Sequence, residues 1–413
     1  MAASPSEVGP DGEPLVHVDV PAEGVPPIVE TPDALAETVR RLREGTGPVA
    51  VDAERAAGFR YSQRAYLVQL RREGSGTHLV DPIPLVDHLH ELREVLNSLP
   101  WILHAASQDL PCLRELGLEP PRLFDTELAG RLLGRTRVGL GPMVGELIGV
   151  SLAKEHSAAD WSIRPIPESA RAYAALDVEY LTTLQELLSL ELEKAGKTEW
   201  AEQEFEHVRQ LPDAAPRPDP WRRTNSIGDV RSPRGLAVVR ELWTVRDAIA
   251  QRVDIAPGRM VNDRAIVALA SRDPLPQALP SSREWRKHDP EAWATAYERA
   301  LSLPAAELPP RRGPSRGGLP EPRAWTRVNP PAARRLVAVR EAVFGLAEEQ
   351  ALPQENLLAP ATQRRIAWES TVPSPAEVNQ IATRDGARPW QVEIVAEPLG
   401  ETLARLAKES RGR

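Results

Sequence analysis

Asp52 and Glu54 are the first residues in the chain whose types and spacing could do chemistry. They end the apolar stretch 47–54 (Gly-Pro-Val-Ala-Val-Asp-Ala-Glu), which predicts a strand. Side chains on a strand alternate between two faces, so both carboxylates point the same way. Buried together they repel each other and lose solvation, and a bound cation removes both penalties. Two solvated acids at a strand end would show the same spacing, so this pair alone does not decide between the two interpretations.

Three later residues could complete a metal site. Asp109 follows the short apolar run 101–105 and starts a predicted helix, a usual position for a functional residue in a protein built on a sheet. Tyr173 and Asp177 are four residues apart in another predicted helix and share one face of it. Taken singly, an acid in the position of Asp109 is most often a helix cap, and a pair such as Tyr173 and Asp177 is most often part of a solvated polar stripe.

The segments that carry these residues predict an α/β domain. A helix is expected from Pro32, capped by Thr31, to about Arg43. Two strands at 65–70 and 77–81, joined by a turn at 73–76, predict an antiparallel meander. A further strand over 101–105 and several helices follow, at 85–96, 108–116, 123–133, 140–148 and 167–194. This order predicts a mixed sheet with helices packed against it.

The length of 413 residues predicts two or three domains, and clusters of proline mark the linkers between them. We expect a disordered segment, a first domain, a linker, a small all-α domain, a second linker and a second small all-α domain, at 1–29, 30–210, 211–231, 232–303, 304–327 and 328–410. The two all-α domains share the length and apolar spacing of a long helix, a Pro-containing turn and a short helix. This similarity predicts a diverged internal repeat.

Charge divides the chain into two halves. The net charge is −8, but residues 1–220 carry −15 and residues 221–413 carry +7, which indicates two different tasks. The single cysteine, Cys112, excludes an intrachain disulfide and is expected to be a small core residue. We find no signal-peptide pattern and no run of about 18 apolar residues, so we expect a cytoplasmic protein.

The order Asp-x-Glu, Asp, Tyr-x-x-x-Asp resembles the DEDD superfamily of 3′–5′ exonucleases, in the subclass marked by tyrosine. Three further stretches resemble family motifs: 104–110 (His-Ala-Ala-Ser-Gln-Asp-Leu), 124–126 (Phe-Asp-Thr) and 160–165 (Asp-Trp-Ser-Ile-Arg-Pro). Residues 30–210 are similar to the exonuclease domain of the ribonuclease D family, and the two all-α domains resemble HRDC domains. One exonuclease domain followed by two HRDC domains is the arrangement of that family.

The resemblance implies an RNase H-like α/β fold and two divalent metal ions, Mg²⁺ or Mn²⁺. It implies that Asp52, Glu54, Asp109 and Asp177 hold the ions and that Tyr173 orients the attacking water. Hydrolysis would release nucleoside 5′-monophosphates from RNA 3′ ends, with precursors of transfer RNA or other structured RNA with a single-stranded 3′ tail as partners. No protein partner and no membrane association are expected.

The sequence departs from the family pattern beside the second acid. Many relatives carry Phe there, whereas this chain has Arg55, so Phe59 and Tyr61 become candidates for stacking on the terminal base. His104 and Lys154 are further candidates for substrate contacts. Core packing explains His104 equally well.

Two other functions stay open at this point. HRDC domains also occur on helicases, so a DNA 3′–5′ exonuclease or repair nuclease is an alternative, although no Gly-rich loop followed by Lys and Ser/Thr is present to support helicase activity. A nuclease that has become an RNA-binding scaffold is the other alternative. The presence of all four carboxylates argues against it.

Overall fold

The computed structural model describes residues 8–10, 12–152, 159–213, 215, 217–311, 313 and 318–411. Its first part is a six-stranded sheet in the order β2-β5-β4-β3-β6-β7. The strands are Ile28–Val29 (β2), Thr46–Arg55 (β3), Ala65–Glu73 (β4), Gly76–Val80 (β5), Trp101–Leu103 (β6) and Leu123–Asp125 (β7). Strands β3, β4 and β5 form an antiparallel meander, whereas β2, β6 and β7 join in parallel. The predicted mixed sheet is confirmed.

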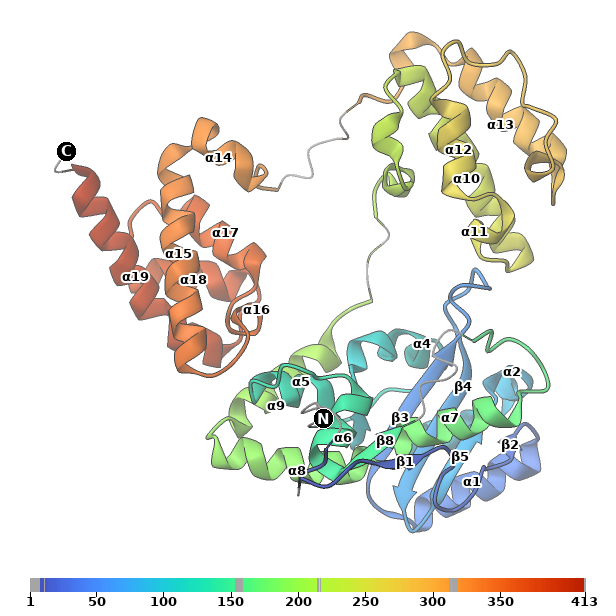
Figure 1. The fold of residues 1–413 in the computed structure, drawn as a ribbon, viewed down its shortest axis with the longest axis vertical. Helices are drawn as coiled ribbons and strands as arrows, with labels where there is room; N and C mark the ends of the chain where they lie inside the picture. The colour runs from blue at the N-terminus through green and yellow to red at the C-terminus, as the bar shows by residue number, and fades with distance from the viewer. Residues whose placement is uncertain are drawn as a thin grey trace.

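Helices cover this sheet (Figure 1). The helices of the first part are Pro32–Glu44 (α1), Pro82–Leu85 (α2), His90–Leu96 (α3), Leu110–Glu115 (α4), Thr126–Leu132 (α5), Leu140–Ile148 (α6), Glu168–Glu179 (α7), Leu181–Lys194 (α8) and Thr198–Gln210 (α9). Helix α7 lies against β3, β4 and β5, and α8 lies against β3 and β6. Helix α1 begins and ends as predicted, because Thr31 accepts a hydrogen bond from the Ala34 amide and Gly45 closes the last turn.

Three sequence predictions are corrected in this part. The helix expected over 123–133 begins at Thr126, because residues 123–125 form the edge strand β7. The helix expected over 167–194 is broken at Tyr180 into α7 and α8, and the one over 85–96 is interrupted by a 3₁₀ turn. A strand of three residues such as β7 shows too little alternation to be recognised, so the helical spacing of apolar residues after it determined the prediction for 123–133.

The prediction of disorder over 1–29 is wrong where short strands form. Residues 1–7 lie outside the described part of the chain. Val16–Val18 (β1) pairs in parallel with Val150–Leu152 (β8), and β2 adds to the edge of the sheet beside β5. Backbone pairing with strands that are already in place orders these short valine segments in spite of their Pro- and Gly-rich surroundings.

Two helical modules follow. The first consists of Pro233–Val253 (α10), Pro257–Met260 (α11), Asp263–Ala270 (α12) and Pro290–Ser302 (α13). The second consists of Pro322–Val328 (α14), Pro330–Glu349 (α15), Gln354–Leu357 (α16), Pro360–Glu369 (α17), Pro375–Arg384 (α18) and Pro389–Arg411 (α19). A long helix, a one-turn helix and a medium helix recur in the same order, α10-α11-α12 and α15-α16-α17, as the predicted repeat requires. Within the described residues no helix is both long and apolar enough to cross a membrane.

Packed structure begins earlier in each module than the predicted linkers allow. Trp221 and Val230 are buried in the core of the first module, although they fall in the linker predicted over 211–231. Trp325 on α14 is buried in the second module, although it falls in the linker predicted over 304–327. Prolines start these helices at their first turn, where a missing amide costs nothing, so proline alone does not mark a linker here.

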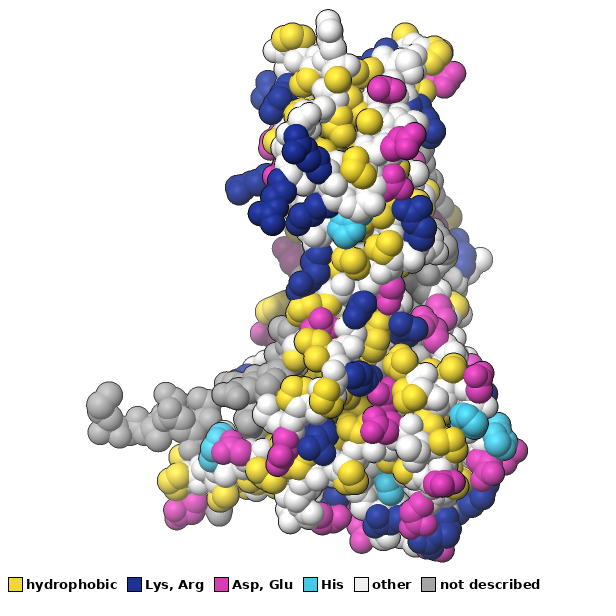
Figure 2. Space-filling view, turned by 90° about the vertical axis from the view of Figure 1, so that its right-hand side faces the viewer, with side chains coloured by type: hydrophobic (Ala, Val, Ile, Leu, Met, Phe, Trp, Pro, Cys, Tyr) yellow, Lys and Arg dark blue, Asp and Glu magenta, His cyan; other side chains and the backbone are white. Residues whose placement is uncertain are grey.

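Both modules contact the exonuclease-like part through side chains. Trp390 of α19 stacks on Trp200 of α9 with 4.7 Å between ring centroids, and it donates a hydrogen bond to buried Glu204. Figure 2 shows the first module above the sheet domain, with Lys and Arg side chains gathered along one side of its upper part. Asp and Glu are frequent on the lower part.

Candidate metal centre

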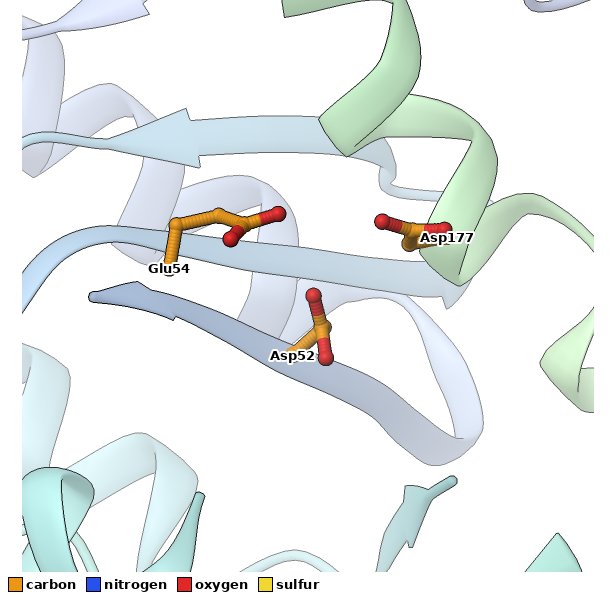
Figure 3. A group of neighbouring side chains, drawn as sticks. All are labelled: Asp52, Glu54 and Asp177. Carbon is orange, nitrogen blue, oxygen red and sulfur yellow. The ribbon is translucent and has the colours of Figure 1, made fainter. Parts of the chain in front are cut away.

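Three carboxylates meet where α7 crosses β3. Asp52 and Glu54 project from one face of β3, and Asp177 projects toward them from α7 (Figure 3). Each offers an oxygen atom within 4.8 Å of the other two. Tight packing of α7 against the sheet through Ala170, Ala174 and Ala175 brings Asp177 this close to the strand. Oxygen-only ligands at this spacing suit a hard divalent cation such as Mg²⁺ or Mn²⁺.

Asp109 lies beside this group without belonging to it. It is the N-cap residue of α4, follows β6 and a 3₁₀ turn, and is buried. Its charge raises the pKa of Glu54 and Asp177, so it lies within electrostatic reach of both. The structure thus brings all four predicted carboxylates to one region, with three in contact range of a single ion.

Burial makes these acids hard to ionise. Desolvation raises the pKa of Asp52 to about 6 and that of Glu54 to about 10, where Asp52, Asp177 and Asp109 add to the effect. Desolvation and the charge of Asp52 raise the pKa of Asp109 and Asp177 well above their usual values. Divalent cations would supply the positive charge that this cluster lacks, so the residues fit the metal that the fold implies.

Tyr173 lies one helical turn before Asp177. Burial, followed by the charges of Asp177, Glu54 and Asp52, raises the pKa of its hydroxyl, so the group stays protonated at neutral pH. A hydrogen bond from Tyr173 lowers the pKa of Asp177 against the larger effect of desolvation. The ring packs near Trp161, with 6.5 Å between centroids, which fixes the hydroxyl at the edge of the carboxylate cluster.

Gln69 is a site residue that sequence reasoning missed. It pairs with Asp52 across β3 and β4, is fully buried, and its Nε2 donates to Oδ2 of Asp52 at 3.1 Å. Its Oε1 has no hydrogen-bond partner among the described residues. A polar residue in the middle of the apolar strand 65–70 was the available signal. Only the strand register shows that it faces Asp52.

The other predicted substrate contacts are occupied by intramolecular partners or lie outside the described residues. Nδ1 of His104 lies 2.9 Å from the Thr126 hydroxyl, and burial lowers the pKa of its ring to about 4. Arg259 lies over the Phe59 ring at 3.9 Å, and the Tyr61 hydroxyl donates to Asp247 at 3.2 Å. Lys154 falls within 153–158, which the structure does not describe.

Asp125 and Cys112 have structural roles. Asp125 caps α5 and accepts hydrogen bonds from the backbone amides of Ala105, Ala106 and Leu128. Cys112 is buried in the core, and burial raises the pKa of its thiol to about 12. An unreactive thiol is what a core position predicts.

Comparison with known families divides the chain as the structure does. Residues 26–193 match the family described as 3′–5′ exonuclease, and residues 235–277 match the HRDC domain. The second helical module, expected to be another HRDC domain, instead matches a family described as the 3′ to 5′ exonuclease C-terminal domain, over residues 318–403.

Whole-chain comparisons agree with these matches. Ribonuclease D of Jannaschia sp. is 31% identical over 69% of this chain and 77% of its own length. The crystal structure of a protein from Bifidobacterium adolescentis superposes with a TM-score of 0.86 and 36% identity, covering 94% of this chain and 100% of that one. Escherichia coli RNase D superposes with a TM-score of 0.63 and 25% identity, covering 93% of this chain and 98% of that one.

Proposed function

Because the chain belongs to the ribonuclease D family of 3′–5′ exoribonucleases, we propose that it trims the 3′ ends of structured RNA and releases nucleoside 5′-monophosphates. Precursors of transfer RNA are the proposed substrates. The observation that carries the proposal is the convergence of Asp52, Glu54 and Asp177 on one point, with Tyr173 beside them.

We propose that Asp52, Glu54, Asp109 and Asp177 hold two divalent ions, Mg²⁺ or Mn²⁺, when the enzyme is active. Two such ions would supply Lewis acidity for cleavage of a phosphodiester. The charge of Asp52 raises the pKa of each of the other three acids, so Asp52 is within electrostatic reach of all of them, and we propose it as the ligand shared by the two ions. Gln69 holds one oxygen of Asp52 in place through its hydrogen bond to Oδ2.

Tyr173 is proposed to orient the attacking water. A phenolic hydroxyl both donates and accepts hydrogen bonds, so it can donate to Asp177 and still accept from a water molecule. Its raised pKa keeps the proton on the phenol, so its role is positioning rather than proton abstraction. The adjacent carboxylates are the groups that can accept a proton.

Substrate contacts remain proposals for His104, Phe59, Tyr61 and Lys154. Among the first three, Phe59 lies in the loop after β3, where it is partly buried, packs against the cluster that contains Tyr66 and Trp161, and has Arg259 over its ring. The structurally similar RNase D of E. coli is described as "an exoribonuclease involved in structured RNA processing". This description supports folded RNA as the substrate class proposed for this chain.

A paired digestion tests the proposal. The protein is incubated with matched 3′-tailed RNA and DNA in Mn²⁺, in Mg²⁺ and in EDTA, and the products are separated by chromatography. We expect nucleoside 5′-monophosphates from RNA in the presence of metal and none in EDTA. Equal or faster release from DNA would favour a DNA exonuclease instead.

A further inference from the structure

Arg55 ends β3 directly beside the carboxylates. The partner strand is out of step at this point, since Glu54 pairs with Leu67 and Arg55 with Ala65, which leaves Tyr66 as an extra residue. The extra residue lies on β4, so the regular pairing of the two strands is disturbed where β3 ends. Nη2 of Arg55 lies 3.9 Å from Oδ1 of Asp109. The guanidinium is therefore turned toward the acidic cluster.

The positive charge of Arg55 acts unevenly on the four acids. It lowers the pKa of Asp52, Glu54 and Asp109, opposing the larger effect of desolvation in each case. The raised pKa of Asp177 has its causes in desolvation, Asp52 and Asp109. Arg55 is thus placed at the Asp109 end of the cluster. The Asp109 side chain is 10% exposed and that of Arg55 is 30% exposed, so solvent screens this pair only partly.

The group of three carboxylates and Asp109 differ in whether a basic side chain forms an ion pair with them. Asp52, Glu54 and Asp177 form a position for one cation, and within the described chain the charge of Arg55 reaches two of them but forms an ion pair with none. Asp109, outside that group, already has a cationic neighbour. A divalent ion between Asp52 and Asp109 must enter next to the guanidinium, which cannot lose its proton and must therefore move or be repelled.

We propose that Arg55 is a positioning residue that serves as the counter-ion of Asp109 before RNA binds. The cation position at Asp109 therefore fills last and weakly. When it fills, the displaced guanidinium contacts a phosphate at the RNA 3′ end. This inference rests on the proposed function. A phosphate offers the fork of the guanidinium the same bidentate partner as a carboxylate. RNA and the second ion therefore favour each other's binding, and the coupling is reciprocal.

Titration of the full-length, metal-free protein with Mn²⁺ in the absence of RNA tests the proposed role of Arg55 as counter-ion of Asp109. Calorimetry on wild type should resolve a tight and a weak step. In R55Q the weak step should tighten by about tenfold, because the repelling charge is gone. R55K keeps the charge and should titrate close to wild type. R43Q is the matched control, because Arg43 pairs with Glu91 and precedes the opposite end of the ten-residue strand β3.

The proposed contact of Arg55 with an RNA phosphate predicts opposite changes in two kinetic constants. The Mn²⁺ concentration for half-maximal activity should fall in R55Q, whereas KM for a short single-stranded RNA should rise by about tenfold through the lost phosphate contact. A merely structural role would not tighten metal binding. The inference is overturned if the weak Mn²⁺ step of R55Q equals that of wild type, or is weaker, in a variant that melts like wild type.

Failure of this inference and failure of the proposed function are distinguishable. The proposed function fails in the wild-type protein, as absence of Mn²⁺ binding or as preference for DNA. The inference fails only in the comparison of R55Q with wild type. If R55Q does not fold, R55K and wild type carry the test, and an R55K titration with a tenfold tighter weak step would overturn the inference as well.

Discussion

Carboxylates of like charge stay together in a half-buried cluster only when other groups compensate for them. In this chain Gln69 donates a hydrogen bond to Asp52, Arg55 offsets the charge at Asp109, and Tyr173 donates to Asp177. These contacts do not cancel desolvation, so the pKa values of all four acids are raised. Without metal, the cluster therefore destabilises the folded protein. Changes in charge, pH or metal at the cluster should alter both the stability of the protein and its activity.

Substitution of Asp52 by Asn should abolish turnover and spare the fold. Asn keeps the shape of Asp but removes the negative charge shared by the two proposed ions, so activity should fall by about 10³-fold or more. The melting temperature without metal should stay level or rise, because repulsion within the cluster is relieved. Activity assays on tailed RNA and a thermal melt in EDTA check both outcomes. Retention of more than about a tenth of wild-type activity would refute the assignment of Asp52.

The stability of the metal-free protein should fall as the pH rises from about 7 to 9. His78 and His104, whose pKa values burial lowers to about 4, change stability in the opposite sense, but only below about pH 7. The folded-state pKa of Glu54 is raised to about 10 and those of Asp109 and Asp177 lie well above their usual values, so the folded state holds more protons than the unfolded state across this interval. Stability therefore decreases with pH, by roughly 2–6 °C in melting temperature. Saturating Mn²⁺ should remove or reverse the slope. A metal-free protein that gains stability over the same interval would contradict the raised pKa values.

Tyr173→Phe should separate water positioning from substrate binding. The substitution removes only the hydroxyl, so metal and RNA should still bind, and kcat should fall by roughly 10²-fold with little change in KM. Steady-state kinetics on a short RNA, with Mn²⁺ binding measured in parallel, give the two constants. A rise in KM at constant kcat would assign Tyr173 to substrate contact instead.

At the scale of secondary-structure elements, the loop after β3 joins the catalytic strand to the first helical module. Asp254, the C-cap of α10 with a positive φ of 49°, accepts hydrogen bonds from the Ser62 amide at 2.9 Å and the Tyr66 hydroxyl at 3.2 Å. Nε of Arg259 donates to the Gly58 carbonyl at 2.8 Å. Phe59 and Tyr61, expected from the sequence to meet the substrate base, also lie in this interface. The loop therefore links the module to the strand that carries Asp52 and Glu54.

Asp254→Ala should loosen this interface without unfolding either part. The Ser62 amide and the Tyr66 hydroxyl lose their acceptor, which typically costs about 1–3 kcal/mol for partly buried donors. We expect faster hydrogen exchange over residues 56–64 and a larger radius of gyration in solution scattering. D229A, which changes an exposed acid of the same module, is the control. Unchanged exchange in the loop would show that other contacts hold the module.

The sequence predicted these elements better than it predicted their contacts. The order of the acids and the tyrosine led to the prediction of Asp52, Glu54, Asp109, Tyr173 and Asp177, which the structure brings to one region, and local periodicity located most helices and the meander. It could not show that Gln69 faces Asp52, because that depends on the register of β3 with β4. It could not place Arg55 beside Asp109 either, because that contact depends on how the start of α4 packs against the end of β3. The short edge strands and the start of each module were missed, because these segments become structured only through tertiary packing.

For the whole molecule, the structure narrows which basic residues are free to meet RNA. The C-terminal half has pairs of adjacent arginines at 222–223, 311–312, 334–335 and 364–365, and these are partly committed to the fold. Arg335 donates to the carbonyls of Ala367 and Trp368, Arg365 pairs with Asp385, and Arg222 pairs with Asp219. Arg312 lies outside the described residues. The net charge of +7 therefore overstates the surface available for phosphate binding.

A segment of the first module is better placed to bind RNA phosphates. Arg283, Arg286 and Lys287 are exposed, with no ion pair found for them within the described chain. They precede Asp289, which pairs with Arg252 at 3.0 Å, two residues before Asp254 at the docked end of α10. Their positive charge therefore lies at the end of the module that faces the catalytic domain. Its partner there should be the body of a folded RNA whose 3′ tail enters the metal centre.

Neutralising this segment in the full-length protein should weaken binding of folded RNA and spare the chemistry. We expect R283Q/R286Q/K287Q to raise KM for a tailed, folded RNA and leave kcat on a short single-stranded RNA unchanged. Each lost phosphate contact should flatten the slope of log K against log salt by about 0.7–0.9, or by about 2 to 3 for the three together. R40Q/R41Q/R43Q on α1 is the matched control, because it removes three exposed arginines from the sheet domain. If both triple variants show the wild-type salt slope, phosphate binding by this segment is refuted, and the first module contributes to the enzyme through its contacts with the loop after β3.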